Sequence, residues 1–130
     1  MKSKYHFNFE DLKVYQKAMD FGEVVHFQTK NFPKEERFEL TSQFRRASDS
    51  IALNIAEGSA GTDKQFYNYL VNAYHSMHEC VSCSSKAFLR RYINEEQNEF
   101  NRKHLTELAK MISTLRSIIS KRIRNDNGRK

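Results

Sequence analysis

Residues Glu36–Gly58 read ERFELTSQFRRASDSIALNIAEG. Apolar side chains recur in this stretch at steps of three and four residues: Leu40, Phe44, Ala47, Ile51 and Ile55. This spacing places them along one side of an α-helix about four turns long, and the glycine that follows is typical of a helix end. The stretch therefore predicts a core-facing helix from about Lys34 or Glu36 to Glu57.

Two more helices are predicted downstream, over residues 63–92 and 95–124. Before each helix, a side chain that can cap it is followed three positions later by Gln, which is the spacing of a capping box. The pairs are Thr62 with Gln65 and Asn94 with Gln97. The last helix carries a narrow apolar seam at near-heptad spacing, made of Leu105, Leu108, Ile112, Leu115, Ile119 and Ile123. Such a seam is typical of a helix docked along a bundle.

A further helix is predicted upstream, capped by Asn8 and ending near Thr29 or Lys30, because Pro33 disfavours helix at the residue before it. It carries two neighbouring apolar stripes. One consists of Leu12, Tyr15, Met19 and Gly22, and the other of Val14, Ala18, Phe21 and Val25. Either the second stripe is buried against a partner chain, or one wide face lies in the core of a single chain.

The length and composition favour one helical domain. The chain has 130 residues with only four Gly and one Pro, too few turn formers for an all-β fold. We predict an all-α, antiparallel, up-down-up-down four-helix bundle over residues 9–124. Residues 1–8 are predicted to form a flexible arm and residues 125–130 a flexible basic tail. The chain shows neither a membrane-spanning run nor a signal-peptide pattern, so we expect a cytoplasmic protein without membrane contact.

Positive charge is concentrated at the C-terminal end. Residues 102–130 hold nine basic and two acidic side chains, whereas the rest of the chain is nearly neutral and the net charge is +6. The basic face of the last helix is expected to bind the phosphate backbone of RNA or DNA, or else an acidic protein. The alternative interpretation is that these charges form an ordinary solvated helix surface. The candidate nucleic-acid-binding residues are Arg116, Lys121, Arg122, Arg124, Lys110, Arg102 and Lys103.

Three segments resemble a known family. FEDLKVYQKAMDF, NFPKEERFELTSQFRRASDSIALNIAEGSA and FYNYLVNAYHSMHE occur in the order and spacing of the bacterial 23S rRNA intervening-sequence proteins, also called S23 ribosomal proteins. The resemblance covers roughly residues 9–120. It implies a four-helix bundle that assembles into a ring-shaped homopentamer. The bundle is also similar to the accessory variability protein of diversity-generating retroelements, a basic pentamer that contacts a reverse transcriptase and nucleic acid; that similarity concerns fold and charge.

The family's polar positions fall here mainly on the second and third helices. We expect a structural polar network made of Gln43, Arg45, Arg46, Asn54, Glu57, Ser76 and Glu79. In it, an Arg guanidinium crosses the bundle to Glu79, because a buried charge persists only when it is paired. No nucleophile with a paired base accompanies these groups, so we predict no catalytic residues, no cofactor and no enzymatic activity.

A cluster of potential metal ligands lies on the predicted third helix: His75, His78, Glu79, Cys80 and Cys83. Zinc sites usually draw ligands from two segments, and the chain has no second ligand pair of that kind. We therefore interpret the cluster as accidental and the two cysteines as small apolar residues of a reducing compartment. No metal site is predicted.

Overall fold

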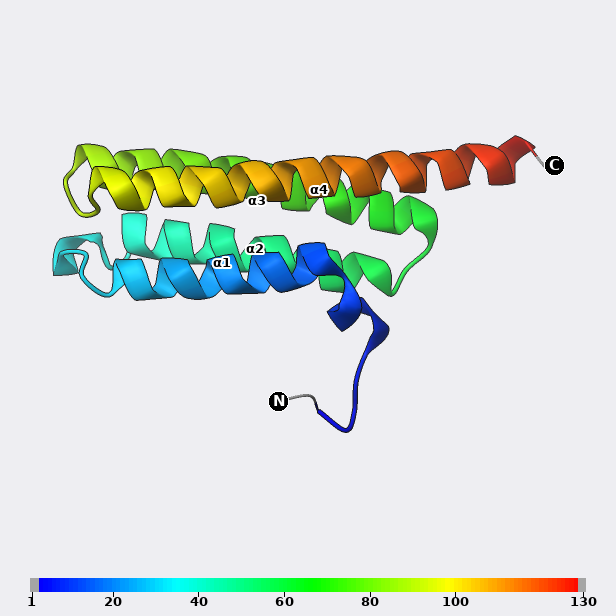
Figure 1. Ribbon diagram of the computed structural model, residues 1–130, viewed down its shortest axis with the longest axis horizontal. Helices are drawn as coiled ribbons and strands as arrows, with labels where there is room; N and C mark the ends of the chain where they lie inside the picture. The colour runs from blue at the N-terminus through cyan, green and yellow to red at the C-terminus, as the bar shows by residue number, and fades with distance from the viewer. Residues whose placement is uncertain (1–2, 129–130) are drawn as a thin grey trace.

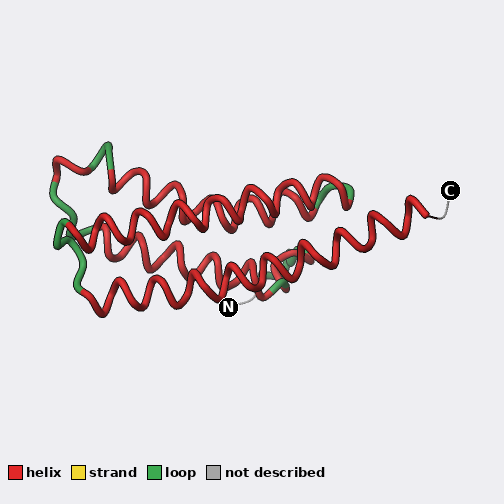
Figure 2. The backbone as a smooth tube through the Cα atoms, turned by 90° about the horizontal axis from the view of Figure 1, so that it is seen from above, coloured by secondary structure: helices red, strands yellow, loops and turns green. Residues whose placement is uncertain are grey.

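The computed structural model describes residues 3–128, which contain four long α-helices, two short 3-10 helices and no strand. The elements are η1 (Asn8–Asp11), α1 (Lys13–Thr29), η2 (Lys34–Glu36), α2 (Leu40–Ser59), α3 (Asp63–Leu89) and α4 (Glu95–Gly128). Consecutive α-helices run in opposite directions, and each packs against two others: α1 and α3 both contact α2 and α4 (Figures 1 and 2). The predicted four-helix bundle is confirmed.

The core lies where the apolar stripes of the four helices meet. The fully buried side chains include Val25, Phe44, Ile51, Ile55, Leu70, Cys80, Leu105, Leu108, Ile112 and Ile119. They come from all four helices at the spacing that one buried side of each helix requires. The predicted stripes of α2 and α4 are therefore confirmed, since their main members face the shared interior.

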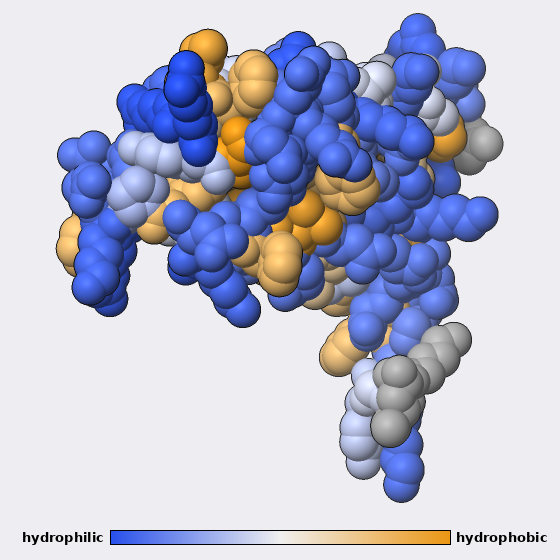
Figure 3. Space-filling model, turned by 60° about the vertical axis from the view of Figure 1, so that its left-hand side comes forward, coloured by the Kyte–Doolittle hydropathy of each residue, from blue (hydrophilic) through white to orange (hydrophobic). Residues whose placement is uncertain are grey.

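On α1, Val14, Ala18, Phe21 and Val25 form the buried stripe. The neighbouring stripe is only partly open, because Leu12 and Tyr15 pack against the edge of the core and Gly22 is buried. Met19 is its one well-exposed member, with 45% of its surface accessible. The two stripes of α1 thus form one wide apolar face, most of which is covered by the rest of the same chain. Figure 3 shows where other apolar side chains reach the surface between polar ones.

Both predicted capping boxes are confirmed. The Thr62 hydroxyl accepts from the Gln65 backbone N–H at 3.2 Å, and the Gln65 side chain accepts from the Thr62 backbone N–H at 2.9 Å. Asn94 and Gln97 make the same reciprocal pair at 2.8 and 2.9 Å. These contacts satisfy backbone donors that have no partner inside α3 or α4, which fixes where the two longest helices begin.

Both ends of α2 differ from the prediction: the helix begins at Leu40, after η2, and not near Lys34 or Glu36. Gly58 does not terminate the helix in a left-handed conformation; α2 continues to Ser59, and no glycine of the described chain has a positive φ. Glycine is required at position 58 because a Cβ there would lie 2.5 Å from the Cβ of Tyr69. The close approach of α3 to α2, rather than a turn, explains this glycine.

The end of α3 also differs. The helix stops at Leu89, before the predicted end near Tyr92, because Arg91 adopts a positive φ of 64°. This left-handed residue lets the Tyr92 backbone N–H donate to the Ala87 carbonyl at 2.8 Å. An arginine thus occupies the position after a helix that glycine usually takes.

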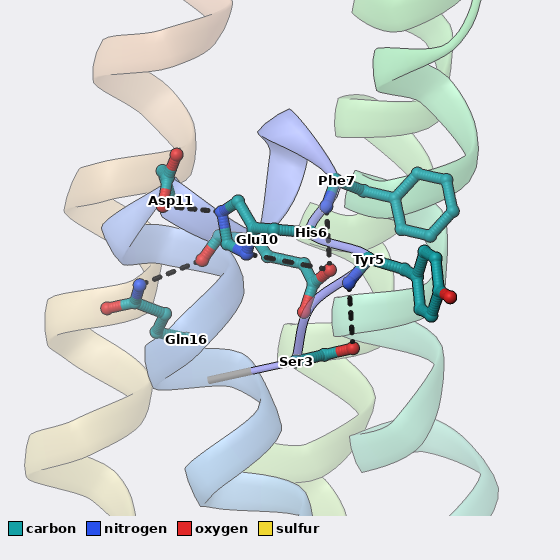
Figure 4. A network of polar contacts seen from close by, with 7 residues as sticks. All are labelled: Ser3, Tyr5, His6, Phe7, Glu10, Asp11 and Gln16. Atoms are coloured by element: carbon teal, nitrogen blue, oxygen red, sulfur yellow. Dashed lines mark hydrogen bonds and ion pairs between the residues drawn. The ribbon is translucent and has the colours of Figure 1, made fainter. Parts of the chain in front are cut away.

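The N-terminal segment does not form the predicted helix capped by Asn8 but makes local hydrogen bonds of its own (Figure 4). Asn8 lies inside η1, and α1 begins at Lys13 because Leu12 is extended at φ −67° and ψ 121°. The Glu10 carboxylate accepts from the Phe7 backbone N–H at 3.0 Å, and His6 bonds Asp11 at 2.8 Å. The predicted flexibility of residues 1–8 stays a prediction, and its first two residues lie outside the described part.

At the other end, α4 continues four residues past the predicted end at Arg124 and reaches Gly128. The helix extends beyond the start of α1 and overhangs the bundle (Figure 1). No residue between Arg124 and Gly128 is a proline, so nothing in the sequence interrupts the backbone hydrogen bonds there. The last two residues of the predicted tail lie outside the described part. None of the helices in residues 3–128 is both long and apolar enough to span a bilayer.

Candidate nucleic-acid interface

Three lysines form a ridge along α4. Lys103, Lys110 and Lys121 are separated by seven and eleven residues, which are close to two and three helical turns, so they share one face. All three are exposed, and none forms an ion pair within 4.0 Å in the described chain. We call these three residues the lysine ridge; it spans ~27 Å of helix at 1.5 Å per residue.

One carboxylate, Glu107, lies within the length of the lysine ridge, and it is already paired. Lys17 of α1 donates to Glu107 at 2.9 Å. This hydrogen bond, followed by the Lys17 charge, lowers the pKa of the Glu107 carboxyl below its usual range. Glu107 is therefore paired chiefly with Lys17 of α1; Lys103 has a smaller effect on the same carboxyl, and the three ridge lysines form no ion pair of their own within residues 3–128.

The four predicted arginines occupy different positions on α4. Arg102 and Arg124 are exposed, and Arg102 donates to the Ser85 hydroxyl at 3.2 Å. Arg122 lies 3.8 Å from the Asp63 carboxylate at the start of α3. Arg102 and Arg124 are thus exposed on α4 without a carboxylate partner among the described residues, whereas Arg122 has one in its own chain.

Arg116 is held by two aromatic rings of α3. Its guanidinium lies 5.4 Å from the ring centroid of Tyr67 and 5.5 Å from that of Tyr74, and it donates to the Tyr67 hydroxyl at 3.4 Å. The Nε atom is buried and has no hydrogen-bond partner in the described chain. Arg116 is therefore a fixed, half-buried cation, not a mobile surface charge.

The expected crossing from an Arg to Glu79 is wrong. Glu79 and Arg46 are both exposed; they line one open, polar hollow and form no ion pair within 4.0 Å in the described residues. Arg45 turns to α1 instead, where its Nε donates to the Thr29 hydroxyl at 2.7 Å. Because Glu79 stays in contact with solvent, it needs no buried partner.

A smaller polar cluster does join α2 to α3. The Asn54 amide donates to the Ser50 hydroxyl and carbonyl, both at 2.8 Å, and the Ser76 hydroxyl donates to Ser50 at 2.9 Å. Asn54 and Ser76 therefore do belong to one network. Gln43 lines the hollow with Glu79, and Glu57 is exposed, so neither joins this cluster.

A buried polar network that was not predicted from the sequence joins α1, α3 and α4. Gln28 of α1 and Asn101 of α4 form a reciprocal amide pair, with both N···O distances at 2.9 Å. Asn101 also donates to Ser84 at 3.0 Å, and Ser84 donates to Asn98 at 2.8 Å. The signal was spacing: Asn98 and Asn101 continue the near-heptad seam that begins at Leu105.

A second missed contact closes the end of the bundle. The buried Glu36 carboxylate accepts from the Tyr92 hydroxyl and from Arg90, each at 2.8 Å. The Tyr92 hydrogen bond, ahead of the Arg90 charge, lowers the pKa of Glu36 although burial opposes the shift. The same hydrogen bond raises the pKa of Tyr92. The two loops that end α1 and α3 are thereby tied together.

The potential metal ligands on α3 do not converge. His75 and Glu79 are exposed, whereas Cys83 is fully buried. Burial raises the pKa of the Cys83 thiol to about 11 and also raises that of Cys80. No group of three His, Cys, Asp or Glu side chains within residues 3–128 is arranged to hold a metal ion.

Comparisons with known proteins place this geometry in a family. The family model described as 23S rRNA-intervening sequence protein matches residues 10–114. A crystal structure of a protein of unknown function from the S23 ribosomal protein family of Bacteroides thetaiotaomicron is similar in fold, with a TM-score of 0.74 and 24% sequence identity. The match covers 80% of this chain and 95% of that one. No curated protein matches the chain. With most of its length covered by the family model, the chain belongs to the 23S rRNA-intervening sequence protein family.

Proposed function

We propose that this protein is a non-enzymatic, nucleic-acid-binding accessory of the bacterial cytoplasm that holds RNA or DNA by the phosphate backbone. The single observation that supports this function is the lysine ridge, because three exposed and unpaired cations follow one side of a helix. A phosphate backbone presents charges at regular intervals along a line, so a row of lysines matches it without reading bases.

The proposed assembly is a homopentameric ring. It is supported by apolar side chains that the single chain leaves open beside α1 and α2. Leu53 is 63% and Phe27 67% exposed, and a hollow lined by Ala18, Met19 and Leu53 lies between the two helices. Open apolar surface of this kind marks contact sites. Light scattering is expected to give five times the chain mass of 15.4 kDa; a mass of one chain would refute the ring.

The binding function is tested by changing the lysine ridge and a matched control. One variant carries Lys103→Gln, Lys110→Gln and Lys121→Gln; the control carries Lys30→Gln, Lys34→Gln and Arg37→Gln in the α1–α2 connection. Both remove three positive charges. Fluorescence anisotropy with a short single-stranded RNA at several salt concentrations then gives the affinity and its salt dependence.

The ridge variant is expected to flatten the slope of log K against log salt by about 2, since each lost phosphate contact removes about 0.7 for a single strand. The control is expected to keep the wild-type slope. Equal losses in the two variants would mean that only net charge matters. Absence of binding by the wild type at low salt would refute nucleic-acid binding.

A second candidate function is an adaptor that binds an acidic protein. It is favoured by an open apolar hollow between the start of α1 and α4, where Leu12, Met111, Leu115 and Ile118 are flanked by Lys13 and Lys110. An amphipathic helix with acidic flanks would match both features. Lys110 belongs to both surfaces, so a change at Ile118, which lines the hollow but is not part of the lysine ridge, distinguishes the candidates: Ile118→Gln is expected to weaken binding of an acidic partner and to leave RNA binding unchanged.

A further inference from the structure

A small polar hollow lies between α3 and α4, next to the lysine ridge. It has a volume of about 260 Å³ and is lined by Tyr67, Ser113, Arg116, Ser117, Ser120 and Arg124. This volume is below the range of about 300–1,000 Å³ that is typical of pockets for whole small molecules. The hollow therefore has the size for one chemical group.

Most hydrogen-bond donors in this hollow have no partner in the described chain; the exception is the Arg116 guanidinium, which donates to the Tyr67 hydroxyl at 3.4 Å. No carboxylate within residues 3–128 lies within 4.0 Å of the guanidinium of Arg116 or Arg124. The hydroxyls of Ser113, Ser117 and Ser120 make no hydrogen bond in the same part of the chain, whereas Thr106 on this helix bonds its own backbone at 2.8 Å. Serine hydroxyls, guanidinium groups and a tyrosine hydroxyl together supply hydrogen-bond donors to an acceptor with several oxygens.

Two of the observations indicate a phosphate rather than a neutral ligand. The guanidinium of Arg116 is fixed by Tyr67 and Tyr74, so one cation is already held in place at the hollow. The lining contains two cations and no acid, so it carries two positive charges. A phosphodiester carries one negative charge, but a terminal phosphate monoester carries nearly two at neutral pH. Charge balance favours the monoester.

We propose that this hollow binds the terminal phosphate of a nucleic-acid strand whose backbone then follows the lysine ridge. This inference rests on the proposed function, since the strand reaches the ridge through backbone contacts. Arg124 lines the hollow, and Lys121 lies one turn before it on α4, so the two sites are continuous. Arg116 and Arg124 pair with the phosphate oxygens, and the serine hydroxyls donate to the remaining ones.

The test compares one short RNA with a 5′-phosphate, a 3′-phosphate or hydroxyls at both ends, at one salt concentration. The RNA with a phosphate at one of its ends is expected to bind at least about tenfold more tightly than the RNA with hydroxyls at both ends, because two charge-assisted contacts to the phosphate add that much affinity. The double variant Ser117→Ala/Ser120→Ala is expected to weaken this preference several-fold, because two donors to the phosphate are lost while both arginines remain, and to bind the hydroxyl RNA as the wild type does. Ser42→Ala/Ser82→Ala, on α2 and α3 and away from the hollow, is the matched control and keeps the preference.

Each outcome separates the two proposals. Equal binding of all three RNAs overturns the phosphate site but leaves the lysine ridge intact. Loss of all RNA binding by the wild type overturns both. A phosphoserine peptide that binds as tightly as the phosphorylated RNA overturns the assignment to a strand end, because the hollow then reads the phosphate alone.

Discussion

Replacing Asn101 with Leu tests whether the buried amide network is required for stability. Leu has nearly the same shape as Asn, so the change removes hydrogen bonds without opening a large cavity. It leaves the Nε2 and Oε1 atoms of Gln28 without their partner at 2.9 Å, in a side chain that is only 5% exposed. Each buried unsatisfied group costs about 1–3 kcal/mol. Ser84 still donates to Asn98 and is not orphaned.

The two orphaned groups together cost about 2–6 kcal/mol, and burial of the added apolar surface returns about 1–2 kcal/mol. At the centres of these ranges, the expected loss in the free energy of unfolding is about 2.5 kcal/mol, or a fall in Tm of about 7–10 °C for a chain of this length. Urea unfolding at a fixed protein concentration measures it, because an oligomer's stability depends on concentration.

The double variant Gln28→Leu/Asn101→Leu is the decisive control. It removes both amides, so no buried group is left unpaired, and its stability is expected to lie within about 1 kcal/mol of the wild type or above it. The two single losses should therefore not add. The reasoning is refuted if the double variant loses the sum of the single losses, or if Asn101→Leu alone changes nothing.

Three further predictions concern the exposed Glu79, the carboxyl pKa of Glu36 and the positive φ of Arg91. Glu79→Ala is expected to change stability by less than about 0.5 kcal/mol, measured by urea unfolding, since its carboxylate is exposed and unpaired; a loss of several kcal/mol would restore the Arg crossing. The ionised Glu36 carboxylate stabilises the fold at a pH above about 4.3, its pKa in the unfolded chain, and this contribution is lost as the pH falls through the lower pKa of the folded state. The difference in Tm between the wild type and Glu36→Gln should therefore shrink below about pH 4. A difference that stays constant with pH would contradict this account. Arg91→Gly should raise stability by about 0.5–1 kcal/mol in thermal unfolding, because glycine adopts φ 64° without strain, and a lower Tm would count against this account.

Local signals in the sequence predicted the fold well. Thr62 with Gln65 and Asn94 with Gln97 fixed the starts of α3 and α4, because a capping box depends on four adjacent residues and little else. Asn8 misled the prediction of α1, since the extended Leu12 that separates η1 from α1 depends on packing against the core edge. Gly58 was placed at a helix end, although its cause is the distant Tyr69.

The candidate site was less predictable because charge alone does not say where a side chain points. The excess of basic residues pointed to the last helix as a whole and did not single out its three aligned lysines, and Arg116 and Arg122 proved to have partners on α3. The Arg crossing failed because two residues on neighbouring helices meet only if both helices present the right face. Asn101 was overlooked because a polar residue at a seam position breaks the apolar pattern that identifies a core.

The two buried cysteines allow the opening of the bundle to be timed without any added probe. Cys80 and Cys83 are both 0% exposed, on the helix that packs against α2 and α4. A thiol reagent can reach them only while α3 has separated from its neighbours, so the labelling rate equals the intrinsic rate multiplied by the fraction of open molecules. An opening free energy of about 7 kcal/mol would slow the reaction about 10⁵-fold relative to the unfolded chain.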